Sequence, residues 1–363
     1  MIELDTDFPG GNITVESLDG EAVRLQQDLR STTEWWFHWH FRIRGAAGRT
    51  VRFTFTNGDV FTADGPCYSV DGANWRWLGR EVVEDNGFTF TFPDDVNEAF
   101  FAMGVPYVQS HLRSFLAGRP AIEQSVLTRT EAGRDAELLR LRSRTGQHVV
   151  LLTARTHACE SMASYVLEGI LDFWLADGSP EAARLREAVD VLAIPFVDKD
   201  GVEAGDQGKL RAPHDHNRDY IDEPLYATTR AVIAVVARER DRLRVGLDLH
   251  CPWIRGERNE DFYVVGPPPP WDAAALELAQ VIERSRRGEV PLWAAAYLPF
   301  GVEWNNNAQA RTLSRHICVT APACQAAVSV EIPYSRATGV QMTPGRARAL
   351  GADLARAMGR FIQ

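Results

Sequence analysis

Three short apolar segments of this chain each lead into side chains that bind metal ions or carry protons. They are residues 148–154 followed by His157 and Glu160, residues 242–249 followed by His250, and residues 326–330 followed by Glu331. Each segment has the length and apolar content of a buried strand. A carboxylate without a partner is costly on a buried strand, so this repeated ending points to one shared site.

The chain beyond about residue 105 alternates between such strands and amphipathic helices. Apolar residues recur at i, i+3, i+4 spacing from Met162 to Trp174, which predicts a helix. Further helices are predicted for residues 228–240, 271–286 and 344–359. This alternation predicts an α/β domain with a doubly wound sheet, and such sheets bind ligands beyond the carboxyl ends of their strands.

The first hundred residues have a different pattern, in which short alternating segments are separated by turn-forming residues. We therefore predict an all-β sandwich domain in residues 1–104 and the α/β domain in residues 105–363. Half of the ten tryptophans lie in the first part: Trp35, Trp36, Trp39, Trp75 and Trp77. Exposed rings would suit stacking on sugars, but rings that fill the core and the domain interface are the favoured interpretation. His38 and His40 share a strand face without a suitably spaced acidic partner, and we interpret them as structural.

The charge, the apolar runs and the cysteine content of the chain limit which classes of protein it can belong to. A net charge of −10 and the lack of any Lys- or Arg-rich run argue against a nucleic-acid surface. No apolar run reaches the ~20 residues that span a bilayer, and the acidic first residues do not resemble a signal peptide. Five cysteines without a Cys-x-x-Cys pair fit a reducing compartment. We expect a cytoplasmic protein that binds neither nucleic acid nor membranes.

His157, Glu160 and His250 are the preferred candidates for a divalent metal site. Two imidazoles and one carboxylate leave one tetrahedral position open, as in catalytic zinc sites. His214 and His216 form an alternative pair, but strand ends fix geometry better than loops do.

The stretch 200–220 is polar and Gly-rich, and loops of this length without periodicity are usually functional or mobile. Its Asn217 and Arg218 place an amide beside a planar guanidinium, a pair suited to binding a carboxylate through two hydrogen bonds. Cys159 and Cys251 neighbour the proposed ligands, and we interpret them as small, partly buried thiols rather than a redox pair.

Five motifs in order along the chain resemble those of the zinc metallocarboxypeptidases. They are His157-x-x-Glu160, Asp200-Gly-Val202, Asn217-Arg218, Leu247-Asp-Leu-His250 and Ser329-Val-Glu331. The sandwich running into residues 100–107 and 110–116 looks like the cytosolic carboxypeptidase branch, in its bacterial form with an N-terminal β-sandwich domain. This resemblance implies a mixed eight-stranded sheet flanked by helices and preceded by the sandwich. It also implies one zinc ion per chain, and a peptide or protein C-terminus as substrate.

The resemblance further implies roles for individual residues. The zinc would be held by His157, Glu160 and His250, Glu331 would be the general base, and Asn217 and Arg218 would bind the substrate's terminal carboxylate. The family's oxyanion-stabilising arginine has two candidates here, Lys209 and Arg211. Either would serve, because the role requires a fixed positive donor, and Arg211 is slightly favoured.

Two further features concern the substrate. The family's tyrosine upstream of the base is absent between Phe300 and Glu331, which leaves three possible substitutes: Tyr297, Tyr334 and Tyr220. Three basic residues lie where the family places specificity residues and predict an acidic terminal side chain: Arg311, Arg315 and His316. Two other functions stay open, an amide deacylase of the aspartoacylase type and a binding scaffold without catalytic activity.

Overall fold

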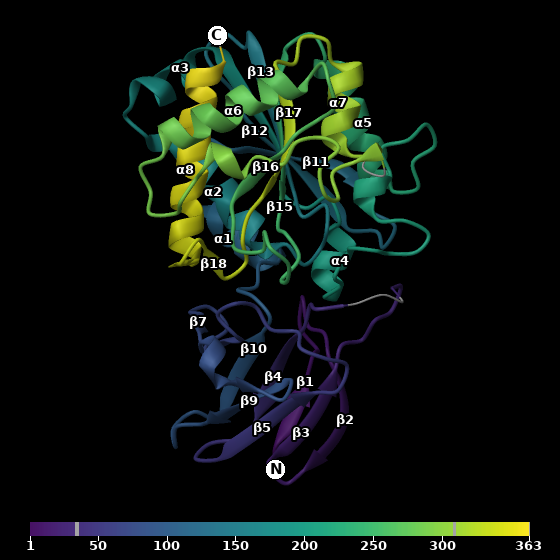
Figure 1. Cartoon of the computed structure of the whole chain (residues 1–363), viewed down its shortest axis with the longest axis vertical. Coiled ribbons are helices and arrows are strands. Elements are labelled where there is room, and N and C mark those ends of the chain that lie inside the picture. The colour runs from purple at the N-terminus through teal and green to yellow at the C-terminus, as the bar shows by residue number, and fades with distance from the viewer. Residues whose placement is uncertain (33–35, 308–309, 363) are drawn as a thin grey trace.

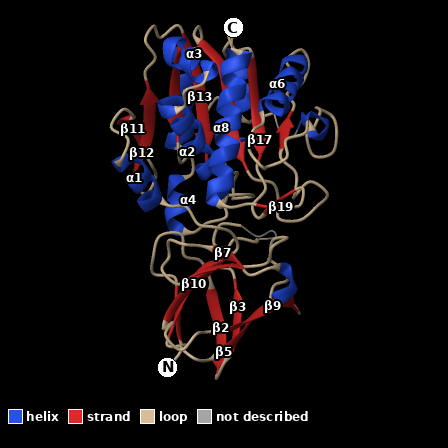
Figure 2. Ribbon diagram, turned by 90° about the vertical axis from the view of Figure 1, so that its left-hand side faces the viewer, coloured by secondary structure: helices blue, strands red, loops and turns tan. Residues whose placement is uncertain are grey.

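The computed structural model describes residues 1–32, 36–307 and 310–362, which form two bodies stacked along one axis (Figure 1). The N-terminal body is a β-sandwich, and the larger body is a mixed sheet covered by helices on both faces (Figure 2). The last sandwich strand ends at Ala102 and the first helix of the larger body begins at Gln109. The boundary that we predicted after residue 104 falls in this connection. Trp35 lies outside the described residues.

The sandwich consists of two five-stranded sheets packed around aromatic rings. One sheet has the order β1 (Glu3–Asp5), β4 (His40–Arg44), β10 (Glu98–Ala102), β6 (Cys67–Ser69), β7 (Arg76–Trp77). The other has the order β2 (Thr14–Asp19), β3 (Ala22–Gln26), β5 (Thr50–Phe55), β9 (Gly87–Thr91), β8 (Val83–Glu84). Trp39, Phe53 and Phe88 meet at the centre, where the Phe53 and Phe88 rings stack with centroids 4.8 Å apart. Aromatic burial on this scale is a large part of what holds a small sandwich together.

The tryptophans of the sandwich fill its core and its contact with the larger body. Trp36 and Trp39 are buried, and Trp77 donates from Nε1 to the main-chain oxygen of Met342 at 2.8 Å. The interpretation of these rings as core and interface residues is confirmed for the described tryptophans. One buried apolar cluster continues from the sandwich into the larger body, so the two bodies share a core.

The larger body is built on a mixed sheet. Its order is β11 (Glu123–Arg129), β12 (Asp135–Leu141), β14 (Val189–Ile194), β13 (His148–Ala154), β15 (Leu243–His250), β17 (Ala326–Glu331), β16 (Tyr263–Val265). The four strands β14, β13, β15 and β17 run parallel, and the outer strands are antiparallel to their neighbours. The mixed α/β class is confirmed. Seven strands form in the described residues instead of the expected eight, because the next position holds only a single bridge between Val265 and Leu298.

Helices cover both faces of this sheet. One face carries α2 (Ser161–Ala176), α3 (Pro180–Ala188), α6 (Asp272–Ser285) and α8 (Pro344–Phe361), and the other carries α5 (Ala227–Glu239) and α7 (Leu313–Thr320) (Figure 1). The remaining elements in the described residues are α1 (Gln109–Ala117), α4 (Lys199–Ala204), 3-10 turns at Arg80–Val82, His216–Arg218 and Ala294–Ala296, and the hairpin of β18 (Arg336–Ala337) and β19 (Val340–Gln341). The stretch 200–220 is not wholly irregular, because it begins in α4.

None of the described helices is long and apolar enough to cross a membrane.

Close packing between α2 and α8 fixes the helix that follows the proposed ligand Glu160. A Cβ atom at Gly169 would overlap the main-chain oxygen of Arg348, and one at Gly351 would overlap that of Val166. The two backbones therefore approach more closely than any larger residue permits. This contact anchors α2, whose first residue follows Glu160, against the rest of the core.

The carboxyl ends of β13, β15 and β17 lie at one edge of the sheet. His250 and Glu331 are partners in the parallel register of β15 and β17, and the chain leaves β13 for His157 just beyond the same edge. The strands that follow β13 in the sequence lie on its two sides, β14 on one and β15 on the other. This reversal of strand order is where open α/β sheets place their ligands.

Candidate active site

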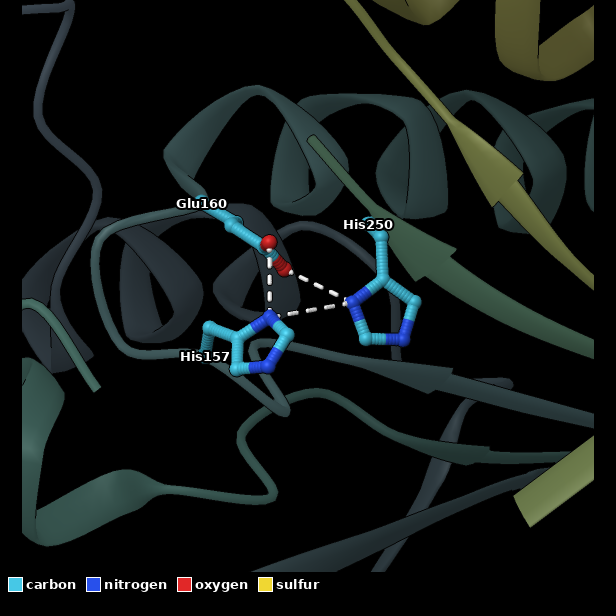
Figure 3. Close-up of side chains that lie close together, drawn as sticks. All are labelled: His157, Glu160 and His250. Atoms are coloured by element: carbon cyan, nitrogen blue, oxygen red, sulfur yellow. Dashed lines mark hydrogen bonds and ion pairs between the residues drawn. The ribbon is translucent and has the colours of Figure 1, made fainter. Parts of the chain in front are cut away.

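Three side chains that the sequence grouped as metal ligands meet in a buried cluster (Figure 3). His157 and Glu160 lie in the turn between β13 and α2, and His250 ends β15. Nδ1 of His157 lies 2.8 Å from Oε1 of Glu160, Nδ1 of His250 lies 3.0 Å from Oε2, and the two Nδ1 atoms are 3.3 Å apart. Among the described residues, no other group of three or more such side chains is close enough to share one ion.

This donor set fits a zinc ion. Ligands bound tetrahedrally at ~2.1 Å from zinc lie about 3.4 Å apart, and the observed separations are only slightly shorter. Two nitrogens and one carboxylate leave a fourth direction for another ligand. Both His157 and His250 line a cavity of about 320 Å³, so a fourth ligand can enter from there.

A further carboxylate, Asp248, orients His250, and a second, Asp215, lies near His157 beyond hydrogen-bond distance; the sequence analysis assigned a role to neither. Asp248 lies 2.8 Å from Nε2 of His250 and accepts hydrogen bonds from Thr153 and Thr156. Asp215 lies 3.9 Å from Nε2 of His157. A carboxylate at Nε2 holds the proton there and leaves Nδ1 free to bind a metal. Asp248 could have been found from its place two residues before His250, on the same face of the strand.

The buried charges of the cluster balance one another. Burial by itself raises the pKa of Glu160, but Lys209, His157 and His250 outweigh it and hold that pKa well below its ordinary value. Burial by itself lowers the pKa of His250, but Asp248 and Glu160 raise it well above 6.5. Glu160 therefore stays an anion, and a metal ion that binds here displaces the proton of His250.

Lys209, and not Arg211, reaches this cluster. Nζ of Lys209 lies 2.7 Å from Oε1 of Glu160 and donates to the main-chain oxygen of Cys251 at 2.8 Å. Burial lowers its pKa, but Glu160 and Glu331 outweigh burial and keep the amine charged. Arg211 pairs with Asp198 and Asp206 and lines a different cavity. The preference for Arg211 was therefore wrong, because the loop turns its guanidinium away from the metal-binding side chains.

Glu331 faces the same cavity with one oxygen unpaired. Its side chain is buried, and Oε2 has no hydrogen-bond partner among the described residues. Burial raises the pKa of Glu331 to about 7, although His250 and Lys209 act in the opposite direction. A carboxyl group with a pKa near neutrality can both accept and return a proton, which suits a general base.

Asn217 and Arg218 line the cavity next to the cluster. The guanidinium of Arg218 is largely buried and donates to the main-chain oxygen of Asn217 at 3.2 Å, but no described carboxylate lies within ion-pair distance of it. Burial lowers the pKa of Arg218, and the nearby Asp215 opposes this shift. A desolvated guanidinium without a carboxylate partner is suited to receive one from a ligand.

Of the three basic residues proposed for specificity, only Arg315 lines the cavity, and its guanidinium lies 4.6 Å from the centroid of the Phe300 ring. Arg311 is exposed and His316 packs near Tyr220, so neither reaches the site. The prediction that all three shape the pocket is therefore wrong for these two.

None of the three tyrosines considered as substitutes lines the cavity. The hydroxyl of Tyr297 donates to the main-chain oxygen of Asp272, and that of Tyr334 contacts Sγ of Cys159. Tyr220 packs in the apolar core beneath α5 and α7. The tyrosine that does line the cavity is Tyr263, the register partner of Glu331 on the antiparallel neighbour β16. No local pattern in the sequence marks this pairing.

The other candidates from the sequence lie away from the cluster. His214 binds Asp219 at 2.7 Å, and His216 stacks on Tyr226 with ring centroids 3.7 Å apart. His38 and His40 belong to no metal-binding group, and burial lowers the pKa of both to about 3. All five cysteines are free; among them, Cys159 and Cys251 are buried.

Comparison with known proteins places this fold and cluster in one family. The family model described as cytosolic carboxypeptidase N-terminal domain matches residues 4–103, and the zinc carboxypeptidase model matches residues 108–250. Human cytosolic carboxypeptidase 2 is 30% identical over 313 residues, which cover 72% of this chain and 34% of the human protein. The corresponding zebrafish protein is 29% identical over 316 residues, covering 73% of this chain and 42% of that protein.

Solved structures share the whole fold. A metallo-carboxypeptidase from Burkholderia cenocepacia superimposes with a TM-score of 0.84 at 20% identity, over 100% of this chain and 99% of that one. One from Pseudomonas aeruginosa, solved in complex with (2-guanidinoethylmercapto)succinic acid, gives a TM-score of 0.81 at 20% identity over 99% of both chains.

The chain therefore belongs to the zinc carboxypeptidase family, in the branch that carries the cytosolic carboxypeptidase N-terminal domain. The family uses zinc, and the His157, Glu160 and His250 group can bind a metal ion. The chain spans less than half the length of the two vertebrate relatives described above. The zinc carboxypeptidase match ends at His250, so Glu331 is placed by the structure and not by that match.

Replacing His250 by alanine tests the ligand set. We expect His250→Ala to lose most of its zinc, because two ligands cannot hold the ion as tightly as three. Elemental analysis of dialysed protein gives the zinc content per chain, and circular dichroism verifies folding. The matched control is His214→Ala, which should retain about one zinc. A folded His250→Ala protein with full zinc would reject this ligand set.

Proposed function

We propose that this chain is a zinc-dependent metallocarboxypeptidase that removes the C-terminal residue of a peptide or protein. The observation that carries the proposal is the contents of one cavity. Within the described part of the chain, it holds two of the three proposed metal ligands, a buried carboxylate with an unpaired oxygen, and a guanidinium without a carboxylate partner. A binding scaffold without catalytic activity has no need for so many buried charges, which are costly to retain.

Each residue of the site has a separate role in the proposed reaction. A zinc ion held by His157, Glu160 and His250 supplies Lewis acidity, which polarises a carbonyl group and makes water a stronger acid. Glu331 accepts the proton of the attacking water through its unpaired Oε2. A carbon–oxygen bond forms at the scissile carbonyl and the carbon–nitrogen bond breaks. Glu331 then passes its proton to the leaving amine, so that it returns to its ionised state.

Lys209 is our candidate for stabilising the negative charge that develops on the carbonyl oxygen. Its ammonium group is charged, buried and fixed by Glu160 and Cys251, beside the proposed metal ligands. A fixed positive donor is worth most in a site from which water is excluded. Arg211 cannot take this role from its position between Asp198 and Asp206.

Asn217 and Arg218 are proposed to bind the terminal carboxylate, and Arg315 to favour an acidic terminal side chain. A panel of peptides that differ only in the last residue tests the second point. We expect terminal Glu or Asp to be preferred, and equal cleavage of terminal Phe or Lys would contradict the role of Arg315.

We also propose that residues 1–104 and 105–363 act as sandwich and catalytic domains of a cytoplasmic protein that binds neither nucleic acid nor membranes. Support comes from the cytosolic relatives, the net charge of −10 and five unpaired thiols. Cell fractionation tests the location, and recovery in the membrane fraction would contradict it.

Glu331→Gln tests the general base. The amide has the same size but cannot accept the proton, so kcat should fall by at least ~10²–10⁴-fold. Glu331 is not a proposed metal ligand, and the variant should therefore fold and keep its zinc. One preparation should be used to measure zinc content, melting temperature and kcat together. Activity within about tenfold of the wild type, with zinc bound, would mean that the base lies elsewhere.

Arg218→Ala tests recognition of the terminal carboxylate. Removing a charge-assisted bidentate contact should lower kcat/KM by roughly tenfold to a few hundredfold on a free C-terminus. Amidating the substrate should have a similar effect on the wild type, and the two changes together should add little. If the wild type cleaves amidated and free peptides equally, the exopeptidase proposal fails and the amide deacylase becomes the better candidate.

A further inference from the structure

The segment 203–212, which carries Lys209, is held along most of its length by the sandwich domain. Hydrogen bonds join its main chain and side chains to described residues of the sandwich. These are Glu203 O with Gly10 N (3.0 Å), Ala204 O with Arg30 (2.5 Å), Gly205 O with Asn12 (2.9 Å), Asp206 with Arg30 (2.6 Å), Gln207 with Phe37 N (2.6 Å), Leu210 O with Thr32 (3.0 Å) and Ala212 N with Ser31 O (3.1 Å).

Gln207 joins the sandwich to the metal-binding turn. Its side-chain Oε1 accepts from the main-chain nitrogen of Phe37, while its own main-chain oxygen accepts from the nitrogen of Cys159 at 3.0 Å. Cys159 immediately precedes Glu160. Gln207 is fully buried, so these bonds form without competition from water.

Thr32 holds the residue next to Lys209. Its hydroxyl donates to the main-chain oxygen of Leu210, whose φ of 56° lies in the left-handed region. Such a conformation is unfavourable for a residue with a side chain, so it persists only where the surroundings impose it. Leu210 is partly exposed and contributes little packing of its own. The restraint on this backbone therefore comes from its hydrogen bonds, among which that of Thr32 comes from the sandwich.

We propose that the sandwich domain is a positioning element of the active site, which fixes the ammonium group of Lys209 by holding segment 203–212 through Thr32 and its neighbours. The proposal rests on the function proposed above. The reason is mechanical: Lys209 has a long flexible side chain on a Gly-rich segment, and such a side chain acts on a developing charge only if its backbone is fixed. Local bonds, such as that from the Leu210 amide to Asp215, hold only part of this backbone, and the sandwich holds most of the rest.

Thr32→Val and Thr32→Ser form a matched pair for testing this. Valine keeps the shape but removes the hydroxyl, whereas serine keeps the hydroxyl. We expect Thr32→Val to lower kcat by roughly two- to tenfold, the worth of one hydrogen bond, with a smaller change in KM and unchanged zinc content. Thr32→Ser should restore kcat. In a Lys209→Ala background, Thr32→Val should have no further effect on kcat.

Trp77→Phe is the control for a general loss of stability. It also removes one hydrogen bond between the two bodies, but that bond goes to the main-chain oxygen of Met342 and not to segment 203–212. Its kcat should stay within twofold of the wild type. If Trp77→Phe lowers kcat as much as Thr32→Val does, or if Thr32→Val and Thr32→Ser have equal kcat, the positioning role is overturned.

Hydrogen exchange separates a failure of this proposal from a failure of the proposed function. The amides of Leu210 and Ala212 are bonded to Asp215 and Ser31, and their exchange should accelerate in Thr32→Val but not in Thr32→Ser or Trp77→Phe. This readout needs no substrate. Equal exchange in all three variants would overturn the anchoring even in an active enzyme. If Thr32→Val does not fold, Arg30→Ala, which removes an exposed donor to Ala204 and Asp206, carries the same measurements.

Discussion

The arrangement of this site follows from burying the carboxylate of Glu160 completely. An ionised carboxylate without water is too costly to keep unless cationic groups and hydrogen-bond donors surround it. His157 comes from the same turn as Glu160, and His250 comes from β15, which neighbours β13 in the sheet. Lys209 comes from segment 203–212, which lies between them in the sequence. Each of these partners is buried as well, and each must be held in turn. The rest of the site can be read as the set of restraints that makes this charge cluster stable.

The parallel strands provide most of those restraints. Because β13, β15 and β17 run in the same direction, the ends of β15 and β17 bring His250 and Glu331 to one edge, and the turn that follows β13 brings His157 to the same edge. The carboxylate of Asp248 on the same strand face as His250, itself fixed by Thr153 on the neighbouring strand, sets the orientation of the imidazole. A site built on strands keeps its geometry better than one built on loops. Glu331 is the exception among the buried carboxylates, because its Oε2 has no partner among the described residues and burial outweighs His250 and Lys209 in setting its pKa.

The sequence was sufficient for those parts of the site that strands deliver. Strands 148–154, 242–249 and 326–330 were predicted within a residue of their observed ends, and with them came the expectation that His157, Glu160, His250 and Glu331 share one site. Periodicity along a chain reports burial of a face, and the end of a parallel strand has a known position. The same reasoning separated the sandwich from the α/β body, because the period of the pattern changes between them.

What the sequence could not supply depends on side-chain directions in loops and on pairing between distant strands. Lys209 and Arg211 are two residues apart in a Gly-rich stretch, and nothing local decides which of them faces Glu160. Tyr263 faces the cavity only because β16 pairs antiparallel with β17 at Glu331. The eighth strand failed to form beyond a single bridge at Leu298, a difference that propensities do not reveal.

The two bodies are best understood as one functional unit. A segment rich in glycine loses much conformational freedom on folding, and its own packing cannot repay that loss. Segment 203–212 lies between the sandwich and the metal-binding turn, and its backbone is bonded to both. The apolar cluster shared by the two bodies fixes their relative position, so the sandwich can act as a rigid wall for that segment. The buried ammonium group of Lys209 can therefore be carried by a loop. Its backbone is fixed by the sandwich domain, as the backbone of a strand residue is fixed by its sheet.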